Sequence, residues 1–215
     1  MNLVHTVFQP SGQGPHPTIL ALHGRGANAL DLLGLAPNIC NGRFLVICPQ
    51  APLEVPIEPG AMGYAWYSSA LPGNPDVQAL LSVRDQLKEF LDACIGSFQI
   101  DPRKLVALGF SQGGAMAYSL ALDQPKRFAA LVAMSSRLSP GLLDHTPSAS
   151  SAEGLPTLIQ HGIHDQTIGV DRGREAAETL RRLSIPVTYQ EYPMGHEISP
   201  RNLSDLSNWL EEKVL

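Results

Sequence analysis

The sequence predicts an α/β protein with a mostly parallel central sheet covered by helices on both faces. Short continuous apolar runs, typical of strands buried on both faces of a sheet, alternate with segments whose apolar residues recur at helical spacing. Strands that alternate with helices form parallel sheets. A length of 215 residues suits one well-cored domain and is short for two, so we expect a single domain over residues 1–215.

The first half of the chain supplies the first three expected strands. Residues 3–8 are expected to form an edge strand, and the apolar runs at 17–22 and 44–48 are expected to form buried strands. Between these runs, Asn28 is expected to cap a short helix that Pro37 ends.

Residues 51–74 are rich in Pro and Gly, and they carry Trp66. A loop of this length inside a compact domain is unusual unless it is functional, so we expect a wall or flap over a site. Trp66 is expected to contact substrate there, with a plain core role as the alternative. Asn74 is then expected to cap the longest helix, with Pro75 at its first position.

The second half of the chain continues the alternation. A polar, Ser- and Pro-rich stretch at residues 139–156 lacks periodicity, and we expect a mobile excursion there rather than a linker between domains. The other elements are expected in this order: strands at 105–108, 129–134 and 157–160, a helix at 172–183, a strand at 187–192, and a last helix that Ser199 caps.

The chain is organised around Gly109-Phe110-Ser111-Gln112-Gly113, which fits the G-x-S-x-G nucleophile elbow. In this elbow a strand turns so sharply into a helix that the serine is exposed, and a Cβ at either flanking glycine would collide across the turn. The helix after Ser111 begins with unpaired N–H groups and a positive dipole end. We therefore expect Ser111 to be a nucleophile beside an anion-stabilising helix terminus.

A second donor to the same anion is expected from the loop after an early strand, where His23-Gly24-Arg25-Gly26 lies. The backbone N–H groups of Arg25 and Gln112 would then face a developing oxyanion.

A serine hydroxyl is a poor nucleophile near neutral pH, so it needs a general base and an acid that orients the base. In enzymes with this elbow the chain order is Ser, then Asp or Glu, then His. Among seven histidines, His196 best fits this order, because it lies in a Gly/Pro loop between the last expected strand and helix. Asp165 directly follows a buried strand, whereas Asp144 lies in the irregular stretch and Asp171 suits a helix cap. We expect Ser111, Asp165 and His196 to form a triad.

Two other kinds of site fit the sequence less well. Residues 161–165 (HGIHD) contain metal-binding side chains, but their spacing matches no zinc motif and no further cluster completes a ligand set. Residues 24–29 fit the dinucleotide fingerprint G-x-G-x-x-A, but the acidic residue expected about 20 residues later is missing. We therefore expect no metal and no cofactor.

Composition limits the partners. A net charge of −5 without any Lys/Arg-rich run argues against nucleic acid or an anionic membrane surface. The first residues do not resemble a signal peptide, and no apolar run is long enough for stable membrane insertion. The three cysteines lack metal or redox spacing, so we expect core residues of a reduced, cytoplasmic protein. The oligomeric state stays open, with a homodimer as one alternative.

Six segments, spread in order over nearly the whole chain, carry a family resemblance: Leu22–Gly26, Cys48–Pro52, Ala65–Tyr67, Gly109–Ala117, His161–Asp165 and Gly195–Ile198. They resemble the small phospholipase/carboxylesterase family of α/β-hydrolases, which includes the acyl-protein thioesterases. This resemblance implies an α/β-hydrolase fold with little or no cap domain, hydrolysis of carboxylic esters or thioesters, and no cofactor. The resemblance also implies that Ser111, Asp165 and His196 form the triad. It implies Arg25 and Gln112 as the oxyanion residues.

Two positions depart from the family pattern. Members commonly carry an apolar residue where this chain has Arg25, and an acid where it has Ser68 and Ser69. The first change leaves the backbone donor intact but alters the wall of the acyl pocket, and the second leaves the leaving-group preference open.

We expect a serine carboxylesterase that hydrolyses small-molecule esters with short to medium acyl chains through an acyl-enzyme on Ser111. The alternative is an acyl thioesterase or lysophospholipase that acts on longer chains. A non-catalytic ligand-binding module would be expected to have a broken triad, and none of the three positions is broken.

Overall fold

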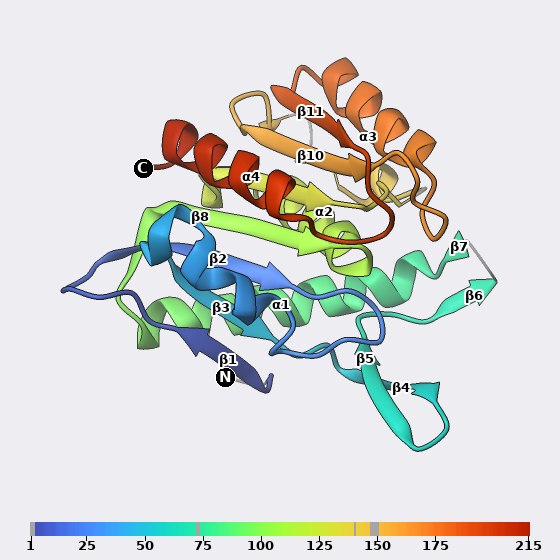
Figure 1. Cartoon of the computed structure of the whole chain (residues 1–215), viewed down its shortest axis with the longest axis horizontal. Coiled ribbons are helices and arrows are strands. Elements are labelled where there is room, and N and C mark those ends of the chain that lie inside the picture. Colours follow the sequence, from blue (N-terminus) through green and yellow to red (C-terminus); the bar gives the residue numbers. More distant parts are fainter. Residues whose placement is uncertain (1–2, 72–73, 140, 147–150) are drawn as a thin grey trace.

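The computed structural model describes residues 3–71, 74–139, 141–146 and 151–215. Its centre is a seven-stranded sheet (Figure 1). One edge pair is antiparallel and the other pairings in this sheet are parallel, as predicted. The strands follow the spatial order β1 (His5–Phe8), β3 (Leu45–Pro49), β2 (His16–Leu22), β8 (Ile100–Phe110), β9 (Ala130–Met134), β10 (Thr157–Gly162) and β11 (Val187–Tyr192).

Helices cover both faces of the sheet, which confirms the predicted fold class. One face is covered by α1 (Val77–Ser97), α2 (Gln112–Asp123) and α3 (Val170–Arg182). The other is covered by α4 (Pro200–Lys213) and the 3₁₀ helices η1 (Leu32–Asn38) and η2 (Cys40–Gly42) (Figure 1). The apolar strands supply both cores, because successive side chains point to opposite faces. In β2, Leu20 and Leu22 join the first core, whereas Ile19 and Ala21 join the second.

The short helix expected after Asn28 begins later than predicted. The Asn28 side chain accepts a hydrogen bond from the Leu30 N–H (2.8 Å), so it shapes a turn instead of capping a helix. The helix η1 begins at Leu32 and contains Pro37 instead of ending before it. Asn side chains form such local turns as readily as caps, and the sequence does not separate the two.

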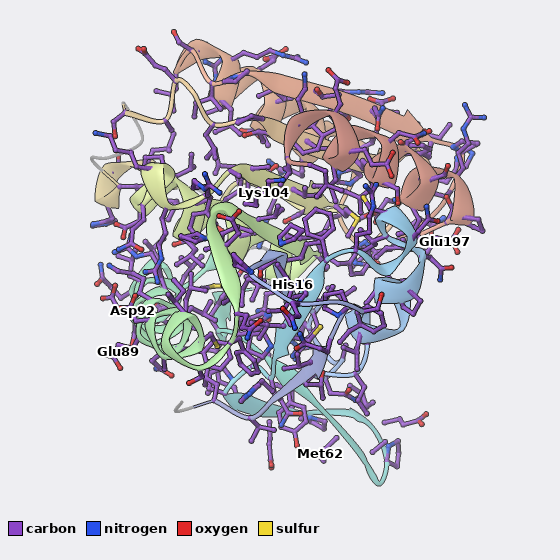
Figure 2. All side chains as sticks on the ribbon, turned by 90° about the vertical axis from the view of Figure 1, so that its left-hand side faces the viewer. His16, Met62, Glu89, Asp92, Lys104 and Glu197 are labelled. Carbon is purple, nitrogen blue, oxygen red and sulfur yellow. The ribbon has the colours of Figure 1, made fainter. Side chains whose placement is uncertain are left out.

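The stretch 51–74 contains strands that the sequence analysis missed. It forms a hairpin of β4 (Leu53–Glu58) and β5 (Ala61–Ala65), followed by the short pair β6 (Ser69–Leu71) and β7 (Asn74–Pro75). The β4–β5 hairpin projects from the body of the protein, and its Met62 lies on the surface (Figures 1 and 2). Because the hairpin buries little apolar surface, its sequence lacks the apolar pattern that predicts strands.

The start of α1 also differs from the prediction. Asp76, not Asn74, is the N-cap, and its side chain accepts from the N–H groups of Gln78 (3.0 Å) and Ala79 (3.2 Å). Asn74 and Pro75 belong to β7 instead. The last helix begins as predicted, because Ser199 caps α4 in a capping box with Asn202.

The described part of the polar stretch 139–156 is packed, so the expectation of a mobile excursion is wrong for that part. It contains the 3₁₀ helix η4 (Leu143–His145), and Leu142, Ala152 and Leu155 are buried in the core. Residues 140 and 147–150 lie outside the described residues.

The cysteines are confirmed as core residues, because all three are buried and none forms a disulfide. Within the described ranges, no helix is both long and apolar enough to cross a membrane.

Candidate active site

The loops at the carboxyl ends of four strands bring the predicted site residues to one edge of the sheet. Arg25 follows β2, Ser111 follows β8, Asp165 follows β10 and His196 follows β11. Ligands bind at the carboxyl ends of the strands in open α/β sheets. Residues far apart in sequence therefore meet where this fold class places its sites.

Ser111 sits on the sharp turn between β8 and α2. Its φ of 55° and ψ of −119° are strained for a residue with a Cβ. The Ser111 N–H donates to the Met134 carbonyl (2.9 Å), and the Ser136 hydroxyl donates to the Ser111 carbonyl (2.7 Å). These bonds to the neighbouring strand and its loop hold the strained backbone in place.

The flanking glycines are required by close backbone contact, as the motif predicts. A Cβ on Gly109 would lie 2.1 Å from the Gly113 carbonyl oxygen, and a Cβ on Gly113 would lie 2.0 Å from that of Leu22. No side chain fits at such distances. The turn is therefore packed backbone to backbone against the end of β2.

The side chain of His196 lies within hydrogen-bond distance of both other predicted triad side chains, Ser111 and Asp165. His196 Nε2 lies 2.9 Å from Ser111 Oγ, and His196 Nδ1 lies 2.7 Å from Asp165 Oδ2. The Asp165 side chain is completely buried, and its Oδ1 accepts from the N–H groups of Thr167 (2.9 Å) and Ile168 (2.8 Å). A carboxylate only accepts, so Nδ1 carries the imidazole proton and Nε2 is free to take the serine proton.

The loop that carries Arg25 is held against the β4–β5 hairpin. The Gly26 N–H donates to the Tyr64 carbonyl (2.8 Å), and the Tyr64 N–H donates to the Ala27 carbonyl (2.9 Å). Gln112 is the first residue of α2, so its N–H has no acceptor within the helix. This geometry leaves the backbone of both expected oxyanion residues near the elbow, while the Arg25 side chain is exposed.

Trp66 connects these two segments from inside the core. Its Nε1–H donates to the His23 carbonyl (2.8 Å), and its backbone N–H donates to Gln112 Oε1 (2.9 Å). The Gln112 amide in turn donates to the Tyr67 carbonyl (2.8 Å). With 0 % of its surface exposed, Trp66 does not line a substrate site. The structure therefore corrects the expectation of a substrate contact and supports the core role.

His23 completes this network, and the sequence analysis missed it. Its Nδ1 lies 2.7 Å from the Gly24 carbonyl and therefore donates, whereas its Nε2 accepts from the Ala51 N–H (3.1 Å). Burial lowers the pKa of the imidazole, and it outweighs the raising effects of the Gly24 carbonyl and of Asp31. Both bonds need a neutral ring. His23 precedes Ser111, so the Ser–Asp–His order gave no reason to select it.

Two hollows adjoin the site. One, of about 530 Å³, lies beside residues 23–26, which are named the oxyanion loop after the expected donor Arg25. It is lined by Arg25, Leu53, Glu54, Val55, Ala65, Tyr67 and Ser68. The other, of about 250 Å³, lies beside the imidazole and is lined by Asp31, Leu32, Leu35, Phe110, His196, Glu197 and Ile198. Each combines apolar walls with a few polar groups, as substrate sites usually do.

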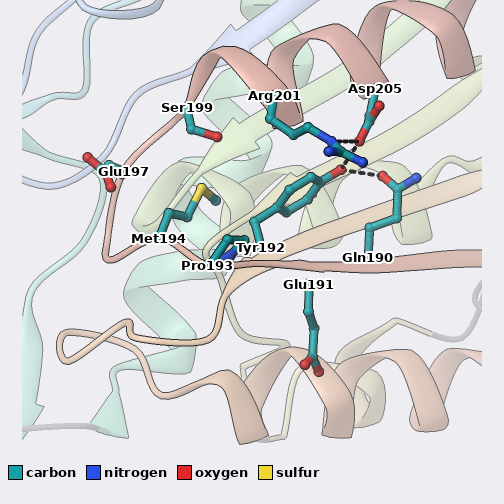
Figure 3. A pocket seen from close by; sticks show the side chains of 9 residues that line it. All are labelled: Gln190, Glu191, Tyr192, Pro193, Met194, Glu197, Ser199, Arg201 and Asp205. Atoms are coloured by element: carbon teal, nitrogen blue, oxygen red, sulfur yellow. Dashed lines mark hydrogen bonds and ion pairs between the residues drawn. The ribbon is translucent and has the colours of Figure 1, made fainter.

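A larger hollow of about 690 Å³ lies beside β11 and the start of α4 (Figure 3). None of the three triad residues lines it. Inside it, the Tyr192 hydroxyl lies 2.7 Å from Gln190 Oε1 and 3.1 Å from Asp205 Oδ2. These contacts tie α4 to β11, so they brace both ends of the loop that carries His196.

The histidines of residues 161–165 do not form a metal site. His161 is buried and its Nε2 lies 2.8 Å from the Ile168 carbonyl, whereas His164 is exposed. In the part of the chain that the structure describes, no three His, Cys, Asp or Glu side chains gather in a way that would hold a metal ion. Asp171 lies in the first turn of α3 behind the N-cap Gly169, so it is not the cap that we expected.

The sheet order and the elbow at its carboxyl edge define an α/β-hydrolase fold. A sequence model described as Phospholipase/Carboxylesterase matches residues 4–214, so the chain belongs to that family, as the sequence resemblance implied. Among relatives, an acyl-protein thioesterase 1 of Mycosarcoma maydis is 26% identical and covers 95% of this chain and 94% of its own. A probable carboxylesterase of Arabidopsis thaliana, SOBER1-like, is 28% identical, and the match covers 91% of this chain and 78% of that protein.

Solved structures show the same fold. A Bacillus cereus carboxylesterase matches with a TM-score of 0.81 at 22% identity, over 99% of this chain and 95% of that chain. Acyl-protein thioesterase 2 of Zea mays matches with a TM-score of 0.80 at 22% identity, over 99% of both chains. The family is one of ester and thioester hydrolases that act on small ester substrates.

Replacing Trp66 by Phe tests whether this residue supports the oxyanion loop. The variant leaves the buried His23 carbonyl without its donor, which costs about 1–3 kcal/mol. We expect a lower free energy of unfolding in urea together with slower turnover of p-nitrophenyl acetate.

Trp209→Phe is the matched control, because it loses an equivalent bond to Thr188 Oγ1 (3.0 Å) on the α4 face. It should lower stability and leave turnover unchanged. An equal loss of turnover in both variants would contradict a specific role of Trp66.

The pH dependence of stability is a second prediction. Because burial lowers the pKa of His23 in the folded state, the unfolded chain binds this proton more readily once the pH falls below the ordinary histidine value of about 6.5. We expect the free energy of unfolding to fall between about pH 7.5 and 5.5, with a His23 contribution of at most about 1.4 kcal/mol per pH unit.

Urea titrations of the wild type and of His23→Gln at several pH values isolate this contribution. The variant should lose less stability on acidification. Parallel losses in both proteins would show that His23 is not a source of the acid sensitivity.

Proposed function

We propose that the chain is a serine carboxylesterase that hydrolyses small-molecule esters through an acyl-enzyme on Ser111. The observation that carries this proposal is the continuous contact from Ser111 Oγ to His196 Nε2 (2.9 Å) and from His196 Nδ1 to Asp165 Oδ2 (2.7 Å). Membership in the phospholipase/carboxylesterase family supports it. Residues 1–215 are proposed to act as one domain, because the helices of both faces pack on one sheet.

In the first half of the proposed reaction, Ser111 Oγ attacks the ester carbonyl carbon while His196 Nε2 takes the hydroxyl proton. The resulting oxyanion accepts hydrogen bonds from the N–H groups of Arg25 and Gln112, and such donors are worth about 3 to 4 kcal/mol each. The positive end of α2 adds to this stabilisation. His196 then gives its proton to the leaving alcohol, and the acyl group remains on Ser111.

In the second half, His196 takes a proton from water, which attacks the acyl-enzyme through a second oxyanion. The acid is released and Ser111 regains its proton. Asp165 holds the Nδ1–H of His196 and stabilises the imidazolium that forms in each half. These steps use protein groups and water alone.

The hollows beside the site support short to medium acyl chains. The walls contributed by Phe110 and Tyr67 are apolar, but the openings also hold Asp31, Glu54 and Arg25, which a long alkyl chain would desolvate. Cytoplasmic location and a homodimer stay predictions.

An acyl thioesterase or lysophospholipase is the second candidate. Two observations favour it: some relatives are named acyl-protein thioesterase, and the β4–β5 hairpin exposes Leu53, Ile57 and Met62 beside the oxyanion loop. These side chains offer apolar surface to a longer acyl chain.

Ser111→Ala is the direct test of the nucleophile. Without the hydroxyl, kcat for p-nitrophenyl butyrate should fall by roughly 10⁴-fold or more, because the other groups cannot form an acyl-enzyme. A fluorophosphonate probe followed by peptide mapping should place its adduct on Ser111 in the wild type and find none in the variant.

Ser204→Ala removes an exposed hydroxyl from α4 and serves as the control, with labelling and turnover unchanged. An unlabelled wild type would favour a ligand-binding module over an enzyme. Turnover near the wild-type value in Ser111→Ala would instead refute Ser111 as the nucleophile.

A chain-length series separates the two candidate substrates. We expect kcat/KM for p-nitrophenyl esters to be highest between acetyl and octanoyl and to exceed that for acyl thioesters of matched length. The highest kcat/KM on palmitoyl substrates, or on thioesters throughout, would instead establish the second candidate.

A further inference from the structure

The carboxylate of Asp165 has a second imidazole beside it. His161 lies next to the end of β10 and is completely buried. Its Nε2 is 3.5 Å from Asp165 Oδ2 but only 2.8 Å from the Ile168 carbonyl oxygen. The shorter distance is that of a good hydrogen bond and the longer one is not, so the N–H is directed at Ile168.

This contact decides which nitrogen of His161 donates. A carbonyl oxygen only accepts, so Nε2 carries the proton and Nδ1 has the lone pair. Nδ1 is buried and has no hydrogen-bond partner among the residues that the structure describes. A proton on Nδ1 would bury an unpaired donor together with a positive charge, which is costly. The ring therefore supports the site as a neutral donor.

The bond from His161 reaches the residue that holds the other oxygen of Asp165. Ile168 donates its N–H to Asp165 Oδ1 (2.8 Å) and accepts from His161 Nε2 with its carbonyl. The turn from Asp165 to Ile168 is thus fixed to β10 on one side and to the carboxylate on the other. A shift of Ile168 would move the carboxylate away from His196.

Helix α3 is shaped to leave room for this ring. A Cβ on Gly173 would lie 2.6 Å from His161 Nδ1, so a side chain at this position would push the imidazole toward the Asp165 turn. The imidazole is held between α3 and the turn.

The other charged groups near the ring are already engaged. Glu191 stands opposite His161 in the register of β10 and β11. Its carboxylate points toward α3, away from Tyr192 (Figure 3), and binds Arg174 with an Oε1–Nε distance of 2.7 Å. Asp165 faces the ring from its own loop, and its Oδ2 is 2.7 Å from His196.

We propose that His161 is a positioning residue: as a neutral donor to Ile168, it holds the Asp165 carboxylate where His196 Nδ1 binds it. This inference rests on the proposed function. A neutral His161 also leaves the full negative charge of Asp165 to the imidazolium of His196, whereas a charged second imidazole would compete for it.

Two substitutions separate the donor from the bulk of the ring. His161→Met fills much of the space without an N–H group, and His161→Gln places an amide N–H near the position of Nε2. We expect kcat for p-nitrophenyl acetate to fall by about 10- to 100-fold in the Met variant, because small misplacements of catalytic groups have effects of this size. KM should change by less than about two-fold, and Gln should restore most of kcat. Equal losses in both variants would overturn the proposal.

A double-mutant cycle tests whether His161 acts through Asp165. If it does, adding His161→Met to Asp165→Asn should lower kcat/KM by less than about three-fold, since residues in one network are not additive. The full single-variant loss in the Asp165→Asn background would refute the link.

Gly173→Ala covers the case in which His161→Met does not fold. The added Cβ displaces the imidazole of His161. Because alanine favours the helix over glycine by about 1 kcal/mol, a loss of kcat at unchanged KM cannot come from a weaker helix. Wild-type kcat in this variant would overturn the proposal.

Labelling and activity of the wild-type protein show whether the proposed function or only the positioning role of His161 has failed. If it forms no fluorophosphonate adduct on Ser111, the proposed function fails. If it is labelled and active, but the His161 and Gly173 variants keep its kcat, only the positioning role fails.

Discussion

The close approach of three backbone segments at the elbow is the constraint on which the site depends. The turn from β8 into α2 brings Gly113 against the end of β2, so that even one Cβ there would meet the Leu22 carbonyl at 2.0 Å. This contact places the oxyanion loop next to the start of α2. It also forces Ser111 into a backbone conformation that its own Cβ disfavours. The strain persists because β9 and its loop bond the Ser111 backbone on both sides.

The side chains of the site lie on loops, and buried polar contacts give these loops the rigidity that regular structure does not supply. Trp66 and Gln112 connect the oxyanion loop to α2. Tyr192 and Asp205 connect β11 to α4 on either side of the His196 loop (Figure 3). Each bond replaces water at a buried group, so losing one partner leaves the other unsatisfied at a cost greater than the net gain from the bond. Such loops are held in one arrangement.

The sequence predicted the buried strands, the elbow and the chain order of the triad, because these depend on local periodicity or on the order of motifs. It did not predict the β4–β5 hairpin, whose strands bury little apolar surface and contain Pro56. It also assigned Trp66 to the substrate wall. The contacts that place Trp66 in the core join it to residues 43 and 46 positions away, and neither composition nor spacing contains that information. The same holds for His161, whose partner Ile168 is set by the course of one turn.

Three histidines lie around the site, and their surroundings give each a different use. His23 bridges a carbonyl and an N–H, so it is useful only when neutral, and burial lowers its pKa in that direction. His161 also donates as a neutral ring, with its second nitrogen enclosed by α3. Of the three side chains, His196 alone is partly exposed, at 20 %, and its free nitrogen faces a hydroxyl. In the proposed mechanism, proton transfer is therefore confined to His196, while protonation of His23 lowers the stability of the loop beside the proposed site.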